Sequence, residues 1–103
     1  MNDNCLGFLG ILYVARKALI GEEAYSSLSK AKLVLLAKDA KDGTKKMIQN
    51  AKNHHHFPLL EVYAKETLGS ALGYEEVAYI SIIDKRSAEK LISALISKQG
   101  GTI

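Results

Sequence analysis

The sequence predicts an α/β fold, in which helices cover both faces of a mostly parallel or mixed sheet. Short apolar runs alternate along the chain with segments of helical period, giving five expected helices and four expected strands. The most apolar run, residues 33–37, is bounded by polar turn residues, which is typical of a strand buried on both faces. With 103 residues and 48% apolar content, a single domain over residues 1–103 is expected.

The first expected helix covers residues 4–16, where apolar side chains recur at helical spacing and Asp3 or Asn4 would be the N-cap. Its apolar stripe consists of Cys5, Phe8, Leu9, Leu12 and Tyr13. Residues 17–20 are expected to form a short strand. A second helix is then expected over residues 22–28, burying Ala24, Tyr25 and Leu28.

The strand at residues 33–37 leads through a polar turn into a third helix, expected from residue 44. His54, His55 and His56 follow this helix, and a solvated loop is favoured there over a metal site. Three consecutive side chains cannot easily converge on one ion. The chain is therefore expected to fold without metal.

The second half of the chain predicts two further strands and two further helices. The strands are expected at residues 57–63 and 77–83, and a helix at residues 65–72 would be closed by Gly73 as its C-cap. Asp84 is expected to cap the last helix, which would end at Gly100 and Gly101.

Charge is unevenly distributed, although the net charge is only +3. Residues 1–56 carry nine Lys/Arg and five Asp/Glu, whereas residues 57–103 carry five and six. A basic half suits a polyanionic partner such as nucleic acid, and solvated surface lysines explain the charge equally well. The single cysteine, Cys5, lies on an apolar stripe, which indicates a core residue. One cysteine cannot form an internal disulfide, so a reducing cytoplasm is expected. Neither a signal peptide nor a membrane-spanning stretch is expected.

One segment resembles the first motif of haloacid-dehalogenase phosphatases, because Asp39 and Asp42 follow an apolar strand and precede Gly43 and Thr44. The two acids are separated by two residues, whereas that motif separates them by one. The favoured interpretation makes Asp42 a helix cap and Asp39 a turn acid. No phosphate loop or nucleophile elbow is present, so no enzymatic activity and no cofactor are expected.

Three stretches together resemble one family: residues 21–23 (Gly-Glu-Glu), residues 31–40 (AKLVLLAKDA) and residues 58–73 (PLLEVYAKETLGSALG). They resemble the ribosomal L7Ae/L30e family of RNA-binding proteins, with the nearest likeness to its small bacterial YlxQ-like branch. The likeness spans about residues 6–95. It implies a three-layer α/β/α sandwich with a mixed four-stranded sheet.

The resemblance also implies where RNA would be contacted. Members that bind kink-turn RNA open their second helix with Gly-x-Asn-Glu-x-x-Lys. Here Gly21 matches, but Glu23, Ala24 and Ser27 occupy the Asn, Glu and Lys positions. Because Glu22 and Glu23 carry the same sign of charge as phosphate, the motif is degenerate for kink-turn recognition.

A second family contact region corresponds to residues 62–65, where Val62 is apolar, Tyr63 could stack on a base and Lys65 is a cation. We therefore expect a cytoplasmic protein that binds structured RNA, with ribosomal RNA as one candidate and a ribosomal or translation-factor protein as a further partner. Membrane and DNA are not expected. The alternative is a protein-interaction module on the same scaffold. The expected RNA-binding residues are Lys17, Gly21, Glu22, Glu23, Lys38, Lys41, Val62, Tyr63, Ala64 and Lys65.

Overall fold

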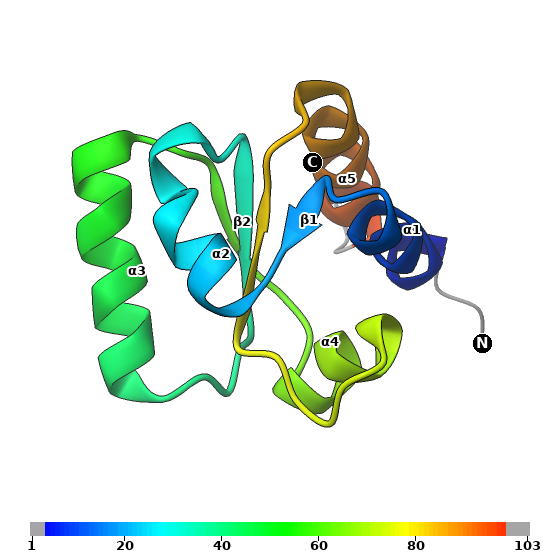
Figure 1. Cartoon of the computed structure of the whole chain (residues 1–103), viewed down its shortest axis with the longest axis horizontal. Coiled ribbons are helices and arrows are strands. Elements are labelled where there is room, and N and C mark those ends of the chain that lie inside the picture. Colours follow the sequence, from blue (N-terminus) through cyan, green and yellow to red (C-terminus); the bar gives the residue numbers. More distant parts are fainter. Residues whose placement is uncertain (1–3, 99–103) are drawn as a thin grey trace.

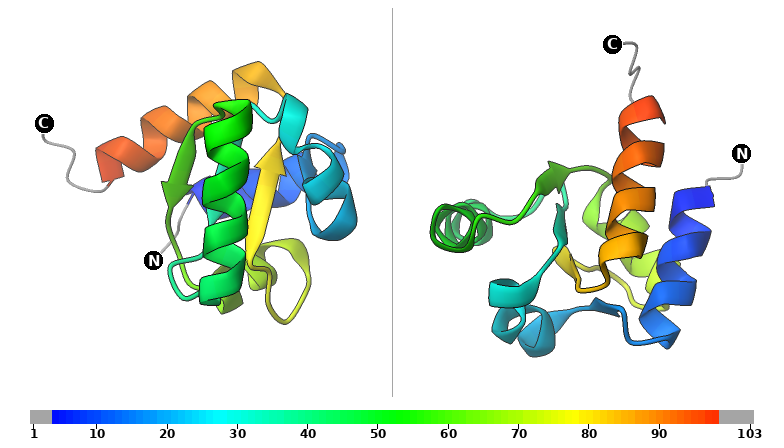
Figure 2. Two further views of the ribbon diagram at one scale, coloured as in Figure 1. Left: turned by 90° about the vertical axis from the view of Figure 1, so that its left-hand side faces the viewer. Right: turned by 90° about the horizontal axis from the view of Figure 1, so that it is seen from above.

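The computed structural model describes residues 4–98 and consists of a mixed four-stranded sheet between two layers of helices (Figure 1). Its elements in chain order are α1 (Asn4–Val14), β1 (Ala18–Leu19), α2 (Gly21–Ser26), the 3₁₀ helix η1 (Leu28–Lys30), β2 (Leu33–Leu36), α3 (Asp42–His55), β3 (Leu59–Glu61), α4 (Lys65–Leu72), β4 (Tyr79–Ile82) and α5 (Lys85–Lys98). Helices α2 and α3 cover one face, while α1, α4 and α5 cover the other (Figures 1 and 2). The predicted three-layer α/β/α sandwich is confirmed.

Strand β2 forms the centre of this architecture. The strand order is β1-β4-β2-β3, and β2 pairs antiparallel with β4 and parallel with β3. All four of its residues are buried, with Leu33, Val34 and Leu35 fully inaccessible. Leu35 lies opposite Ile80 on one side and Leu60 on the other. This confirms the prediction of a strand buried on both faces.

The segment after Gly21 differs from its prediction. Helix α2 has only six residues, and Leu28 reaches the core from the separate 3₁₀ helix η1. Tyr25 was predicted to be buried, but it is 57% exposed. A short helix followed by a tight 3₁₀ turn changes the helical period, so Tyr25 and Leu28 no longer share a face.

The histidines do not form the predicted loop. His54 and His55 belong to the last turn of α3, and His56 is its left-handed C-cap with φ 62°. The His56 backbone N–H donates to the Lys52 carbonyl oxygen at 2.7 Å. The rings of His54 and His55 meet edge to face, with centroids 4.9 Å apart. Within residues 4–98, no group of three His, Cys, Asp or Glu side chains is arranged to hold a metal ion.

Two predicted helix caps are confirmed. Gly73 closes α4 with φ 90°, a conformation that favours glycine. Asp84 accepts hydrogen bonds from the Ser87 backbone N–H at 3.0 Å and from the Ser87 hydroxyl at 2.6 Å. These bonds, and then the charges of Lys17 and Arg86, hold the pKa of Asp84 below its usual value. The positions of Asp3, Gly100 and Gly101 lie outside the described residues.

The strands are shorter than predicted, and no helix within residues 4–98 reaches membrane-spanning size. Pairing is limited to two residues in β1, three in β3 and four in β4. Isolated backbone hydrogen bonds still connect residues beyond the strand ends, such as the bond from the Ala37 N–H to the Ala78 carbonyl oxygen at 2.8 Å. No helix in the described part of the chain is long and apolar enough to cross a membrane.

Substituting Gly69 by alanine should destabilise the fold. A Cβ at this position would lie 2.7 Å from the Glu76 Cα and backbone N, so the loop after α4 would have to move. We expect a loss of about 1–3 kcal/mol in the free energy of unfolding, measured by chemical denaturation. Gly7→Ala is the matched control. Its Cβ would have no neighbour within 4 Å, and removing a helical glycine should stabilise α1 by about 0.5–1 kcal/mol. Equal stability of the two variants would contradict this packing.

Candidate nucleic-acid interface

The directions of the strands bring the predicted contact segments together. Because β4 runs antiparallel to both β1 and β2, and β3 is parallel to β2, the strands β1, β2 and β3 all point the same way. Their carboxyl ends form one edge of the sheet, the lower edge in Figure 1. We call this the carboxyl edge and define it by residues 20–23, 38–41 and 62–65. Ligands of open α/β sheets usually bind at such an edge.

Backbone hydrogen bonds lock two of these loops to each other. The Lys38 N–H donates to the Tyr63 carbonyl oxygen at 2.8 Å, and the Val62 N–H donates to Leu36 at 3.0 Å. The Lys65 N–H donates to Asp39 Oδ1 at 2.8 Å. Lys65 is the first residue of α4, so Asp39 caps this helix from a different loop. The loops after β2 and β3 therefore form one connected surface.

This arrangement reverses the roles expected for the two aspartates. Asp42 was predicted to be the helix cap, but it is the first residue inside α3, and the N-cap is Lys41, which makes no side-chain capping bond. Asp39, predicted to be a turn acid, is the capping residue. The exposed Asp39 carboxylate is thus engaged with the backbone of α4, a structural role that accounts for an acid at this position.

The loop after β3 exposes only part of its predicted contact set. Val62 was expected to contact RNA, but its side chain is 2% exposed and belongs to the hydrophobic core. Tyr63 is half-buried against the core and has φ 66°, a left-handed conformation that is uncommon for any residue except glycine. The reversal at Tyr63 turns the chain from β3 toward α4 and leaves Ala64 exposed.

The four predicted cations have different surroundings. Lys38 and Lys41 are exposed on the carboxyl edge, and neither makes an ion pair with another described residue. The Lys65 ammonium lies 3.7 Å from a Glu76 carboxylate oxygen, so its charge is partly neutralised. Lys17 precedes β1 and accepts a backbone hydrogen bond from Ile83 at 3.0 Å. It therefore lies at the opposite edge of the sheet, away from the other three.

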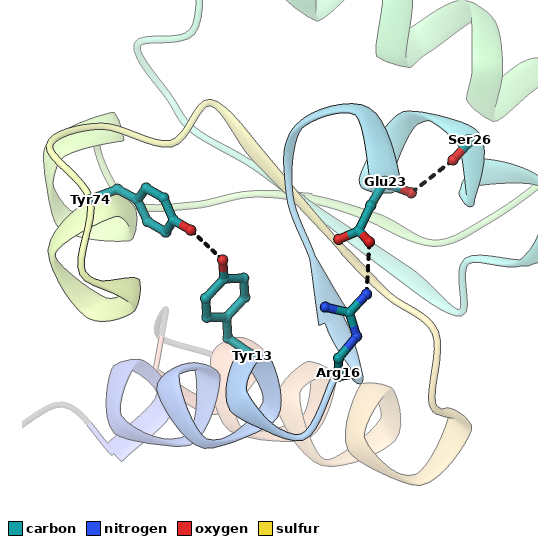
Figure 3. Close-up of polar contacts among 5 residues, drawn as sticks. All are labelled: Tyr13, Arg16, Glu23, Ser26 and Tyr74. Carbon is teal, nitrogen blue, oxygen red and sulfur yellow. Dashed lines mark hydrogen bonds and ion pairs between the residues drawn. The ribbon is translucent and has the colours of Figure 1, made fainter.

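The first turn of α2 carries two negative charges, and one of them, on Glu23, forms an ion pair. Gly21 adopts φ 63° and is followed by the exposed Glu22 and Glu23. Arg16 Nη2 lies 2.7 Å from Glu23 Oε2 (Figure 3), and both side chains are more than half exposed. The same view shows the hydroxyl contact of Tyr13 with Tyr74, which joins α1 to the loop after α4.

Two positions of the degenerate kink-turn motif face inward. Ala24 is fully buried, and its carbonyl oxygen accepts a hydrogen bond from the buried Ser81 hydroxyl at 3.1 Å. Ser27 is 7% exposed, and its N–H donates back to Glu23. Neither position can present a side chain to RNA without disturbing the packing of α2. Sequence spacing alone could not reveal this, because the burial depends on how the short helix rests on the sheet.

The fold and the carboxyl edge define a small α/β/α sandwich protein whose loops gather beside the ends of three co-directional strands. The chain belongs to the ribosomal protein L7Ae/L30e/S12e/Gadd45 family, whose sequence model matches residues 23–92. Two curated relatives are named RNA-binding protein YlxQ, which confirms the predicted likeness to the YlxQ-like branch. The relative from Bacillus subtilis (strain 168) is 34% identical over 90 residues, covering 84% of this chain and 90% of the relative. The relative from Enterococcus faecium is 27% identical, with 85% and 87% covered.

Solved structures agree with this fold. A protein with unknown function from Bacillus halodurans C matches with a TM-score of 0.83 and 28% identity, over 91% of this chain and 98% of that one. The Giardia lamblia 15.5kD RNA binding protein matches with a TM-score of 0.69 and 19% identity, over 100% of this chain and 93% of that one. At this low identity the second likeness supports the fold alone.

Replacing Asp39 by alanine should loosen the carboxyl edge. The Lys65 N–H would lose its carboxylate acceptor, and we expect the free energy of unfolding to fall by about 0.5–2 kcal/mol. Hydrogen exchange at the Lys65 amide should also accelerate. Asp42→Ala removes the same charge from the first turn of α3 without breaking a capping bond, and it should leave that amide unchanged. Equal exchange at Lys65 in both variants would argue against this cap.

Proposed function

We propose that this protein binds structured RNA through the carboxyl edge. The observation that carries the proposal is the gathering of three loops at that edge, with Lys38 and Lys41 exposed and unpaired among the described residues. Membership of the family and the names of the curated relatives support it. Within this proposal the protein acts in the cytoplasm as a binding protein, and ribosomal RNA is one candidate ligand.

The mechanism relies on charge and shape more than on base reading. Lys38 and Lys41 would neutralise phosphates, since electrostatic contacts supply most of the sequence-independent affinity for nucleic acid. The exposed Gly21 turn and the small Ala64 side chain allow an RNA backbone to approach closely. The half-buried ring of Tyr63 offers one face of limited area for stacking.

Selective recognition of a standard kink-turn would be weak. An ionised Glu23 can only accept hydrogen bonds, whereas the Asn of the family motif supplies an amide donor. Ala24 and Ser27 are buried, so they cannot replace the missing contacts. The RNA that binds best should therefore be selected by its shape and its charge density.

A second candidate function is binding to a protein partner. Ile11 and Val14 are separated by one turn of α1, and they are 65% and 82% exposed. Two large apolar side chains on one exposed helical face are a feature of protein-interaction surfaces. Absence of RNA binding at low salt would favour this second function.

Removing the two exposed lysines should reduce the salt dependence of RNA binding. The logarithm of the binding constant falls linearly with the logarithm of the salt concentration. For a hairpin RNA with a stem of about 16 base pairs, Lys38→Gln combined with Lys41→Gln should make this log–log salt slope shallower by about 1.4–1.8. The measurement is a fluorescence titration at several salt concentrations. Lys46→Gln with Lys52→Gln removes the same charge from the body of α3 and is the matched control. An equal change in slope for both pairs would show that net charge, and no particular surface, determines the affinity.

Neutralising Glu23 should strengthen RNA binding more than neutralising Glu22. Both substitutions to glutamine remove one negative charge beside Gly21, but only Glu23→Gln also releases Arg16 from an ion pair. The released guanidinium could then contact a phosphate. We expect the affinity of Glu23→Gln to exceed that of Glu22→Gln by about twofold to fivefold, the equivalent of one exposed ion pair. The two variants would bind equally if Arg16 lies outside the RNA footprint.

A further inference from the structure

The edge of the sheet opposite the carboxyl edge carries a larger concentration of positive charge. The amino ends of β1, β2 and β3 lie there, together with the start of α5, at the upper edge in Figure 1. We call it the amino edge. Lys32 lies at this edge, because its N–H donates to the carbonyl oxygen of Ile82, the last residue of β4, at 2.7 Å. Lys17 lies there as well, since its carbonyl oxygen accepts a hydrogen bond from the Ile83 N–H.

Two adjoining hollows line the amino edge, one on each side of the first turns of α5. The first hollow lies between η1, the C-terminal end of α3 and α5, and its cations are Lys30, Lys32 and Lys85. The second hollow lies between α1, the residue before β1 and α5, and its cations are Lys17, Arg86 and Lys90. Glu89 lines both hollows, so they adjoin across the first turns of α5.

The charges on this surface are unbalanced. Six Lys and Arg side chains face two carboxylates, Asp84 and Glu89, and Asp84 is engaged in capping α5. All six cations are exposed, and none forms an ion pair with another described residue. By contrast, the ion pairs found among the described residues engage Arg16, Lys45 and Lys65.

The shape of the surface suits an extended polyanion. The six cations come from four separate stretches, namely residues 17, 30–32, 85–86 and 90, and they are spread along the edge. No buried polar side-chain atom among the described residues lacks a hydrogen bond, so no buried side-chain donor is left unpaired for a small anion. Distributed and exposed cations are typical of contacts to the phosphates of a nucleic-acid backbone, which position the ligand without reading its sequence.

We propose that the amino edge is a second RNA-binding surface, which contacts the phosphate backbone of an RNA segment different from the one at the carboxyl edge. This inference rests on the proposed function, because it takes RNA as the ligand. The two surfaces lie at opposite ends of the strands in a molecule with extents of 34 × 32 × 26 Å. A bound RNA would therefore have to fold around the protein, or extend along it, to reach both.

Paired charge removals test this inference. Lys32→Gln with Lys85→Gln removes two exposed cations from the amino edge, and Lys38→Gln with Lys41→Gln removes two from the carboxyl edge. Both variants have the same net charge. With the hairpin of about 16 base pairs, each pair should make the log–log salt slope shallower by about 1.4–1.8, and the combined variant should show roughly the sum. The control pair in α3, Lys46→Gln with Lys52→Gln, should change the slope less. An equal change for the control pair would overturn both surfaces, because net charge alone would then account for the slope. Thermal melting without RNA checks that every variant is folded.

The possible outcomes separate this inference from the proposed function. A reduced slope for the carboxyl-edge pair alone would overturn the second surface and leave the proposed function intact. A reduced slope for the amino-edge pair alone would support the second surface and overturn the assignment of RNA binding to the carboxyl edge. If the wild-type protein fails to bind the hairpin at low salt, both proposals are wrong. Binding of the wild type to phosphatidylserine vesicles, lost in the amino-edge variant, would then identify a membrane surface as the ligand.

Discussion

The burial of β2 on both faces is the constraint on which the rest of the structure depends. A strand whose four residues are all buried needs a covering layer on each side of the sheet and a hydrogen-bonded neighbour at each edge. Strands β4 and β3 provide the neighbours, and the two layers of helices provide the cover. Because β4 runs antiparallel to both β1 and β2, and β3 is parallel to β2, three strands end at the same edge. The burial of one strand and the pairing around it thus lead to the gathering of loops at the carboxyl edge.

The carboxyl edge is held together by hydrogen bonds to backbone groups more than by ion pairs. Asp39 caps α4 across two loops, and Lys38 is tied to Tyr63 through main-chain atoms. Such bonds persist at high salt better than exposed ion pairs do, since solvent ions screen charges at the surface. The edge can therefore keep its shape while its exposed lysines exchange between counterions and phosphates. This combination favours a ligand that is recognised by shape and held by charge.

The distribution of ion pairs explains why the two edges differ electrostatically. Near the carboxyl edge, glutamates lie close enough to Arg16 and Lys65 to pair with them, which leaves Lys38 and Lys41 as its unpaired cations among the described residues. At the amino edge the acids are few, and Asp84 is engaged with Ser87. A modest net charge of +3 therefore conceals a strongly positive surface on one side of the molecule. Family membership does not by itself indicate this asymmetry, because it depends on how individual charged side chains pair in this chain.

The sequence by itself determined the α/β class, the buried strand at residues 33–36, the C-cap at Gly73 and the capping role of Asp84. These features depend on residues close together in the chain, where apolar periodicity and capping chemistry act locally. It also led to the correct family through three short stretches. Only the tertiary structure decided that Val62 is buried, that Tyr25 is exposed, that Asp39 and not Asp42 caps a helix, and that Lys17 lies away from Lys38. Each of these depends on the direction and register of strands distant in sequence, or on a helix length that tertiary packing determines. Local sequence patterns do not determine either of these features.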